Sequence, residues 1–149
     1  MTNQSVVFGF TRVPDFMDDY NIEFLVDDMD GSSKNYAFVI ATSCPSNITE
    51  CLNSNGTLSN DVVTYNIGDD GDVALLYSKG VNGNRTISLG ASDVTINVGD
   101  NDIMLAGLFL ISKSSGYVLA YSILARSVPI TNQVIFPATG LVWSIRNEG

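Results

Sequence analysis

Hydrophobic and polar positions alternate along this 149-residue chain in short segments, and turns rich in glycine, asparagine and aspartate separate these segments. A period of two is typical of β-strands, and no segment shows the sustained period of about 3.6 residues that an amphipathic helix needs. The segments expected to form strands are 6–10, 22–26, 36–40, 62–67, 73–77, 85–89, 94–98, 103–111, 117–124, 129–136 and 141–145. This pattern predicts an all-β protein, a single-domain antiparallel β-sandwich of jelly-roll type over residues 1–149, with a closed barrel as the alternative.

Several strand relationships follow from the same pattern. Residues 103–111 form the longest apolar run, about half the length of a transmembrane helix, and this predicts a central strand buried on both faces. Asp30-Gly31 predicts a hairpin between residues 22–26 and 36–40, because Asp-Gly readily adopts positive φ. The last two strands are expected to pair through the turn at 137–140. Residues 63–69 and 94–100 have similar sequences, which predicts comparable places in two sheets.

Residues 42–60 interrupt the alternation and predict an excursion loop. Asn47 followed by Glu50 at the third position indicates a helical turn within it. Cys44 and Cys51 lie in this loop, and the sequence leaves open whether they are free thiols or a disulfide. The loop is expected to serve either as a recognition surface or as a lid over one open end of the sheets.

The net charge is −9, and the seven basic residues are scattered singly along the chain. Such a chain cannot neutralise a row of phosphates, so nucleic acid and anionic membranes are not expected partners. The charge either maintains solubility or favours a basic protein surface or a cation. The first residues lack a basic segment followed by an apolar one, so no targeting segment is expected.

The chain contains no histidine, which excludes Ser-His-Asp and Cys-His catalysis and leaves the two cysteines without the further ligands of a zinc site. Aspartates cluster at residues 27–30 and 69–72, where they suit either calcium ligation or ordinary turns. Neither cluster matches an EF-hand loop, and turn chemistry is the favoured interpretation. We therefore expect no catalytic residue, no cofactor, no bound metal and no enzymatic activity.

Three aromatic residues are candidates for an interface. Tyr117 and Tyr121 are expected to share one face of a strand with Leu119 and Ile123, and Trp143 alternates with apolar neighbours. Such stripes usually belong to the core. Tyrosine and tryptophan also favour interfaces and sugar-stacking platforms, so Tyr117, Tyr121 and Trp143 remain the candidate interface residues.

The last third of the chain has a recognisable order of elements. It consists of Phe109-Leu110-Ile111-Ser112, Ser114-Ser115-Gly116, Tyr117-Val118-Leu119-Ala120-Tyr121, Val128-Pro129-Ile130-Thr131 and a final segment from Phe136 to Ile145. This order resembles small structural proteins of tailed bacteriophages, in which similar segments form the last strands of a β-sandwich used in head, neck or tail assembly. No family site residues can be transferred, because the first hundred residues share no such likeness.

The resemblance implies a non-enzymatic virion protein, with a capsid decoration or auxiliary head role first and a neck or tail role second. Its expected partners are further copies of itself and other virion proteins such as the capsid shell, and its expected location is the virion, assembled in the host cytoplasm. Few lysines are available to protect strand edges, which also favours assembly. The alternative is a carbohydrate-binding β-sandwich module with an aromatic platform, with or without calcium.

Overall fold

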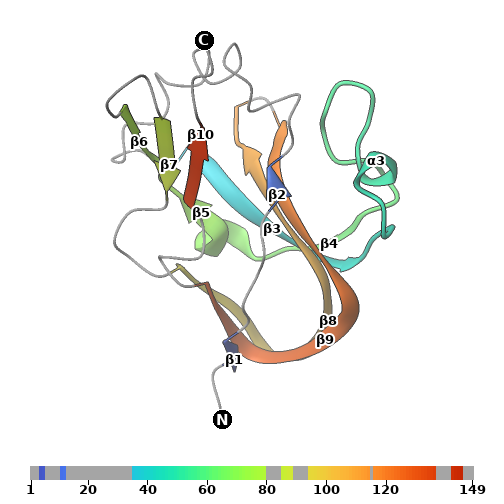
Figure 1. Ribbon diagram of the computed structural model, residues 1–149. Coiled ribbons are helices and arrows are strands. Elements are labelled where there is room, and N and C mark those ends of the chain that lie inside the picture. Colours follow the sequence, from blue (N-terminus) through green and yellow to red (C-terminus); the bar gives the residue numbers. More distant parts are fainter. Residues whose placement is uncertain are drawn as a thin grey trace.

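The computed structural model describes residues 4–5, 11–12, 35–79, 85–88, 94–114, 116–136 and 142–145. Strands account for most of these residues (Figure 1). The described helical segments are the four-residue α-helix α3 (Ile48–Cys51) and the 3-10 helix η2 (Gly68–Gly71). The prediction of an all-β fold is therefore confirmed.

The strands form two sheets. The seven-stranded sheet has the order β1-β9-β8-β3-β4, with β2 also paired to β9 and β5 to β3, and the three-stranded sheet has the order β10-β7-β6. The first sheet contains β1 (Gln4–Ser5), β2 (Thr11–Arg12), β3 (Tyr36–Ser43), β4 (Val63–Tyr65), β5 (Asp72–Val73), β8 (Val94–Ser112) and β9 (Val118–Phe136). The second contains β6 (Leu76–Lys79), β7 (Arg85–Ser88) and β10 (Val142–Ile145). Pairing is antiparallel throughout except between β1 and β9.

The strands β8 and β9, each 19 residues long, form one curled ribbon (Figure 1). Leu105 faces Val128 and Gly107 faces Ile123, so β9 places residues 124–127 opposite Ala106 alone. Extra residues on one strand bend an antiparallel pair, because the outer strand then follows a longer path. The ribbon consequently turns a corner at this point.

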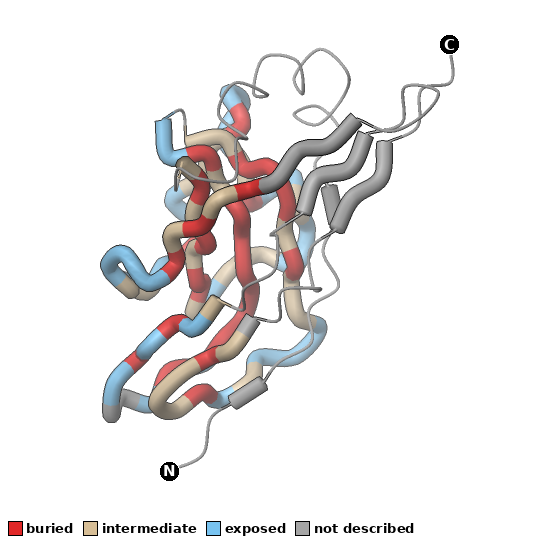
Figure 2. Tube along the Cα trace, turned by 90° about the vertical axis from the view of Figure 1, so that its left-hand side faces the viewer, coloured by how far each residue is buried: buried red, intermediate tan, exposed pale blue. Residues whose placement is uncertain are grey.

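The corner folds one half of the ribbon over the other and encloses the main hydrophobic core. Residues of β3 and of both halves of the β8–β9 ribbon pack in this one cluster. Its members include Tyr36, Phe38, Ile40, Ile96, Val98, Ile103, Leu108, Leu110, Leu119, Ile130 and Val134. Figure 2 shows that the buried positions follow these strands. A single curled sheet thus supplies opposing walls of the core.

The structure confirms the buried central strand and revises its extent. Residues 107–111 lie between β3 and β9, and within 103–111 all residues are buried except Met104, which is 47% exposed, and the half-buried Ile111. However, the strands expected at 94–98 and 103–111 are both part of β8. Those expected at 117–124 and 129–136 likewise belong to β9, because the expected breaks are bends within these two strands.

Two predicted pairings are wrong. Within the described residues β10 pairs with β7, whereas residues 129–136 pair with β8 and β1. The similar segments 63–69 and 94–100 contribute β4 and the start of β8 to the same sheet, so they do not occupy comparable places in two sheets.

The N-terminal strand predictions at 6–10 and 22–26 lie outside the described residues. The expected hairpin between residues 22–26 and 36–40 therefore stays a prediction. Among the described residues, one edge of β3 pairs with β8, and the other pairs with β5 at Tyr36 and Ala37 and with β4 from Ile40 onward.

Candidate interaction surface

The excursion loop is well defined and begins with a capped helical turn. The Asn47 side chain accepts a hydrogen bond from the backbone N–H of Thr49 at 3.1 Å, and the Glu50 N–H donates to the Asn47 carbonyl at 3.0 Å. Asparagine at this position satisfies an otherwise unpaired amide of the first turn. The helical turn and its Asn47 cap, both predicted from the sequence, are confirmed in α3.

The inner side of the loop covers one face of the large sheet. Cys51 of the loop and Val62, just after it, are buried, and they pack in a second hydrophobic cluster with Ala41, Phe109 and Val118 of the sheet. Three further apolar residues of the loop pack against the same cluster, namely Ile48, Leu52 and Leu58. The loop therefore acts as a cover, but it covers a face of the sheet and not an open end.

The outer side of the loop is polar and internally hydrogen-bonded. The Asn53 Nδ2 donates to Thr57 Oγ1 at 3.0 Å and to the Leu58 carbonyl at 3.1 Å. The Asn55 Oδ1 accepts from the Thr57 N–H and hydroxyl at 3.2 and 2.8 Å. The Ser59 hydroxyl donates to the Glu50 carbonyl at 3.0 Å. These bonds fix the loop backbone, so the exposed side presents a preorganised polar surface.

This polar surface continues into the edge strand β4. Val63 is 52% exposed and Thr64 is also exposed, while β4 uses its other edge to pair with β3. No strand among the described residues pairs with the second edge of β4. We call the exposed side chains of this region the loop–edge surface, which comprises Asn47, Thr49, Glu50, Asn53, Asn55, Asp61, Val63 and Thr64.

The loop–edge surface is acidic. It carries Glu50 and Asp61, and residues 42–67 contain neither lysine nor arginine. The loop part of this surface was expected as a recognition surface or a lid, whereas the exposed edge of β4 was not predicted, although the uncharged run 62–67 at an expected strand was a signal for it. Charged residues, lysine above all, usually protect exposed edges from pairing, and β4 has none.

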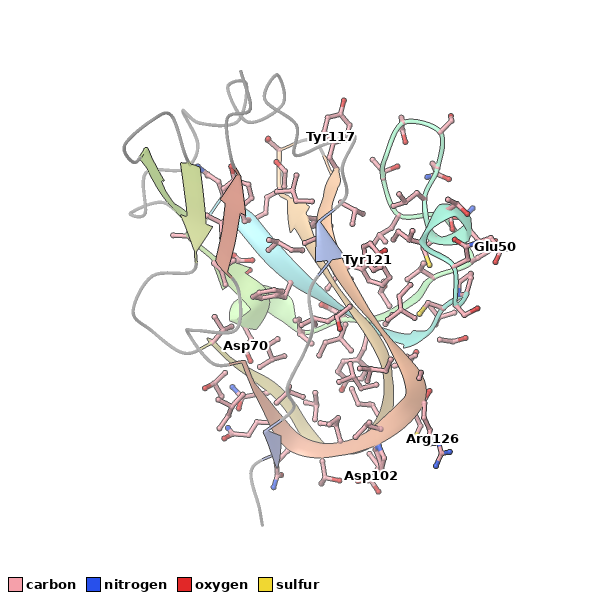
Figure 3. The ribbon with its side chains drawn as sticks, viewed as in Figure 1. Glu50, Asp70, Asp102, Tyr117, Tyr121 and Arg126 are labelled. Atoms are coloured by element: carbon pink, nitrogen blue, oxygen red, sulfur yellow. The ribbon has the colours of Figure 1, made fainter. Side chains whose placement is uncertain are left out.

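The structure does not bring the candidate aromatic residues Tyr117 and Tyr121 together. Leu110 faces Ala120 and Ile111 faces Val118, so Leu119 is an extra residue that reverses the alternation of β9. Tyr117 consequently packs against the main core, whereas Tyr121 packs against the cluster beneath the excursion loop. Figure 3 shows the two half-buried rings at different levels of the strand. The prediction that they share a face is wrong.

Trp143, the third candidate, lies in β10 opposite Ile87 of β7, in the three-stranded sheet. Its side chain is outside the part of the structure that is described. The proposed interface role of the three aromatic residues therefore stays a prediction.

The acidic turn at residues 69–72 contributes to the fold. The Asp70 Oδ2 accepts hydrogen bonds from the backbone N–H and the Nδ2 of Asn97, each at 3.0 Å. The Gln133 Nε2 in turn donates to Asn97 Oδ1 at 3.0 Å. Asp72 forms a 2.6 Å ion pair with Lys113. These contacts join η2 and β5 to the β8–β9 ribbon and its end, so Asp70 and Asp72 have structural partners.

No metal centre is formed by the described residues, since none of their histidine, cysteine, aspartate or glutamate side chains gather in groups of three or more suited to a metal ion. The second acidic cluster, at residues 27–30, lies outside them. The described helices are all too short to cross a lipid bilayer.

The two cysteines are free thiols in close association. Burial, followed by the negative charge that Cys44 acquires on ionisation, raises the pKa of the Cys51 thiol to about 11. Burial also raises the pKa of Cys44, although a hydrogen bond from the Cys51 side chain opposes that increase. Both residues are thus uncharged thiols at neutral pH.

Comparison of the chain with protein-family models, curated proteins and solved structures found no match. The resemblance to phage structural proteins therefore stays a prediction from the order of elements in the last third.

Proposed function

We propose that the protein is a non-enzymatic structural component of a bacteriophage particle that acts by binding other protein subunits. A capsid decoration or auxiliary head role is the first choice, and a neck or tail role is the second. The observation that carries this proposal is the exposed, uncharged edge strand β4, which continues directly into the ordered excursion loop. An exposed edge offers backbone groups to a strand of another chain.

The excursion loop supports the same function. Its backbone is fixed by the hydrogen bonds of Asn53 and Asn55, and its inner side is anchored by Cys51 and Val62. A surface that is already ordered loses little conformational entropy when it binds. The two carboxylates of the loop–edge surface, Glu50 and Asp61, favour a partner surface that carries basic residues.

We further propose that the two sheets belong to a jelly-roll-like β-sandwich spanning residues 1–149. The curled β8–β9 ribbon supports this arrangement because it already places strand segments on opposite sides of one core. The carbohydrate-binding alternative has weaker support, since its aromatic platform required Tyr117 and Tyr121 on one face.

The test is sedimentation equilibrium of the full chain at micromolar concentration, alone and with capsids of a tailed phage. We expect self-association or co-sedimentation, with roughly 800 Å² buried on each partner. Val63→Lys should abolish the association by placing a charge on the edge strand.

Met104→Lys is the matched control, because Met104 is 47% exposed compared with 52% for Val63 and lies on a different strand. It should associate like the wild type. Equal loss in both variants would exclude β4 as the binding edge. A chain that stays monomeric, ignores capsids and binds a glycan would contradict the proposed function as a whole.

A further inference from the structure

The thiols of Cys44 and Cys51 are placed for reaction with one another. Cys44 directly follows β3, and Cys51 ends α3, so the two residues bracket the first turn of the excursion loop. The Cys51 thiol donates a hydrogen bond to the Pro45 carbonyl oxygen at 3.5 Å, which holds its sulfur at the start of the loop beside Cys44. Both side chains belong to the cluster beneath the loop.

Gly107, at the corner of β8, provides space for this pair. A Cβ atom at position 107 would lie 3.2 Å from the Cys44 Sγ and 3.3 Å from the Ser122 carbonyl oxygen. Cys44 is half-buried, whereas Cys51 is fully buried, so reagents reach the pair through Cys44.

We propose that Cys44 and Cys51 form a reversible disulfide that fastens the excursion loop to the end of β3, with a low-molecular-weight disulfide such as glutathione disulfide as the oxidant. Both side chains pack in the cluster beneath the loop, and a disulfide requires their sulfur atoms to reach a bond length of about 2.05 Å. The inference does not depend on the proposed function.

The reaction proceeds by two thiol–disulfide exchanges. The Cys44 thiolate attacks one sulfur of glutathione disulfide, the S–S bond of the oxidant breaks, and one glutathione thiolate leaves. The Cys51 thiolate then attacks the Cys44 sulfur of the mixed disulfide and releases the second glutathione. The protein loses two electrons and two protons, and the oxidant is reduced to two glutathione thiols.

Cys44 reacts first because it is half-buried and therefore the more exposed sulfur, whereas Cys51 is fully buried. The Cys51 thiolate forms less readily, but closure is intramolecular and both side chains already pack in the same cluster. The disulfide would hold α3 on its cluster and thereby fix the loop–edge surface.

The experiment treats the folded full chain with excess glutathione disulfide at mildly alkaline pH, blocks the remaining thiols with an alkylating agent and measures the intact mass. We expect the loss of both thiols without retained glutathione. Glu50 lies between the cysteines, so a glutamate-specific protease applied after denaturation separates them in the reduced chain. In the oxidised chain the fragments ending at Glu50 and beginning at Cys51 should stay joined until a reductant is added.

Two single variants serve as controls. Cys51→Ala should retain one glutathione on Cys44, because no second thiol displaces it, whereas Cys44→Ala should react slowly at its buried Cys51. The inference is overturned if the wild type retains glutathione as Cys51→Ala does. It is also overturned if the wild type keeps both thiols during an incubation that modifies the Cys51→Ala variant.

Discussion

Gly99 and Asn132 face each other across the β8–β9 ladder, and both have left-handed backbone conformations, with φ of 71° and 73°. On one side of this pair Asn97 faces Gln133, so Val98 is an extra residue of β8, and on the other side Ile103 faces Ile130. β8 thus places residues 100–102 opposite Thr131 alone, and the Thr131 hydroxyl donates a hydrogen bond to the Asp102 carboxylate. Glycine and asparagine tolerate this conformation best, so the pair permits a second bend in the ribbon.

Gly99→Ala tests this backbone requirement. No atom lies within 4 Å of a Cβ added at Gly99, so the cost is conformational and should be about 1 kcal/mol of unfolding free energy. Thr95→Ala, at an exposed position of the same strand, should cost at most about 0.5 kcal/mol. Urea unfolding measures both, and equal losses would show that the left-handed conformation of Gly99 is not required.

The centre of β8 should respond strongly to truncation. Leu108 and Leu110 are 1% and 0% exposed, so replacing either with alanine should cost roughly 2 to 5 kcal/mol through lost burial and a residual cavity. Met104→Ala, on the same strand but largely exposed, should change stability by at most about 0.5 kcal/mol. Unchanged unfolding midpoints for both leucine variants would contradict the central position of β8.

Asp70 and Asp69 are neighbours with different roles. Asp70→Ala removes the acceptor of both Asn97 hydrogen bonds and should cost about 1 kcal/mol. Asp69 is exposed, and its side chain makes no hydrogen bond within the described part of the chain, so Asp69→Ala should be nearly neutral. Urea unfolding measures both variants. If only the loss of acidic charge mattered, the two substitutions would change the free energy of unfolding by the same amount, which would contradict the structural role of Asp70.

Calcium should leave the melting temperature unchanged. Asp70 and Asp72 already bind Asn97 and Lys113, which leaves few oxygen atoms in this turn for a cation. Thermal unfolding in millimolar calcium and in excess chelator should therefore coincide. A rise of several degrees that grows with calcium concentration would show a bound ion, because ligands of the native state stabilise it by mass action.

Alkaline pH should weaken the fold through Cys51. Its folded-state pKa of about 11 exceeds the ordinary value of 9.0, so the unfolded chain releases this proton first as pH rises. The stability contributed by the neutral thiol is fully present below pH 9 and is lost as pH rises toward 11. The loss should be on the order of 2 kcal/mol. Urea unfolding under reducing conditions should show a shallower decline in Cys51→Ala, and identical pH profiles would contradict this account.

Local sequence signals predicted the elements whose formation depends on neighbouring residues. Alternation identified β3 and the buried part of β8, and asparagine at position 47 identified the start of α3. Each of these signals acts within a few residues, through side-chain periodicity or through one capping hydrogen bond.

Features that depend on register between distant strands were not predictable in this way. The residues Gly99-Asp100-Asn101 are typical of a turn between two strands. In the structure they bend one continuous strand, because Gly99 faces Asn132 of β9. The extra residue Leu119 separates Tyr117 from Tyr121, and nothing in their spacing indicates a bulge. The exposed edge of β4 depends on the strand order, in which β3 lies between β8 and β4, and the sequence does not indicate that order.

The unequal corner of the ribbon has a consequence for changes in chain length. Residues 124–127 of β9 have no one-to-one partners in β8, and Ala125, Arg126 and Ser127 are exposed. An insertion there lengthens the outer path while the pairings Leu105–Val128 and Gly107–Ile123 keep their register. An insertion beside Ala106 on the inner strand instead exchanges the two faces of β8 beyond it, since one added residue reverses every side chain. Length variation in this ribbon should therefore be confined to one of its two strands.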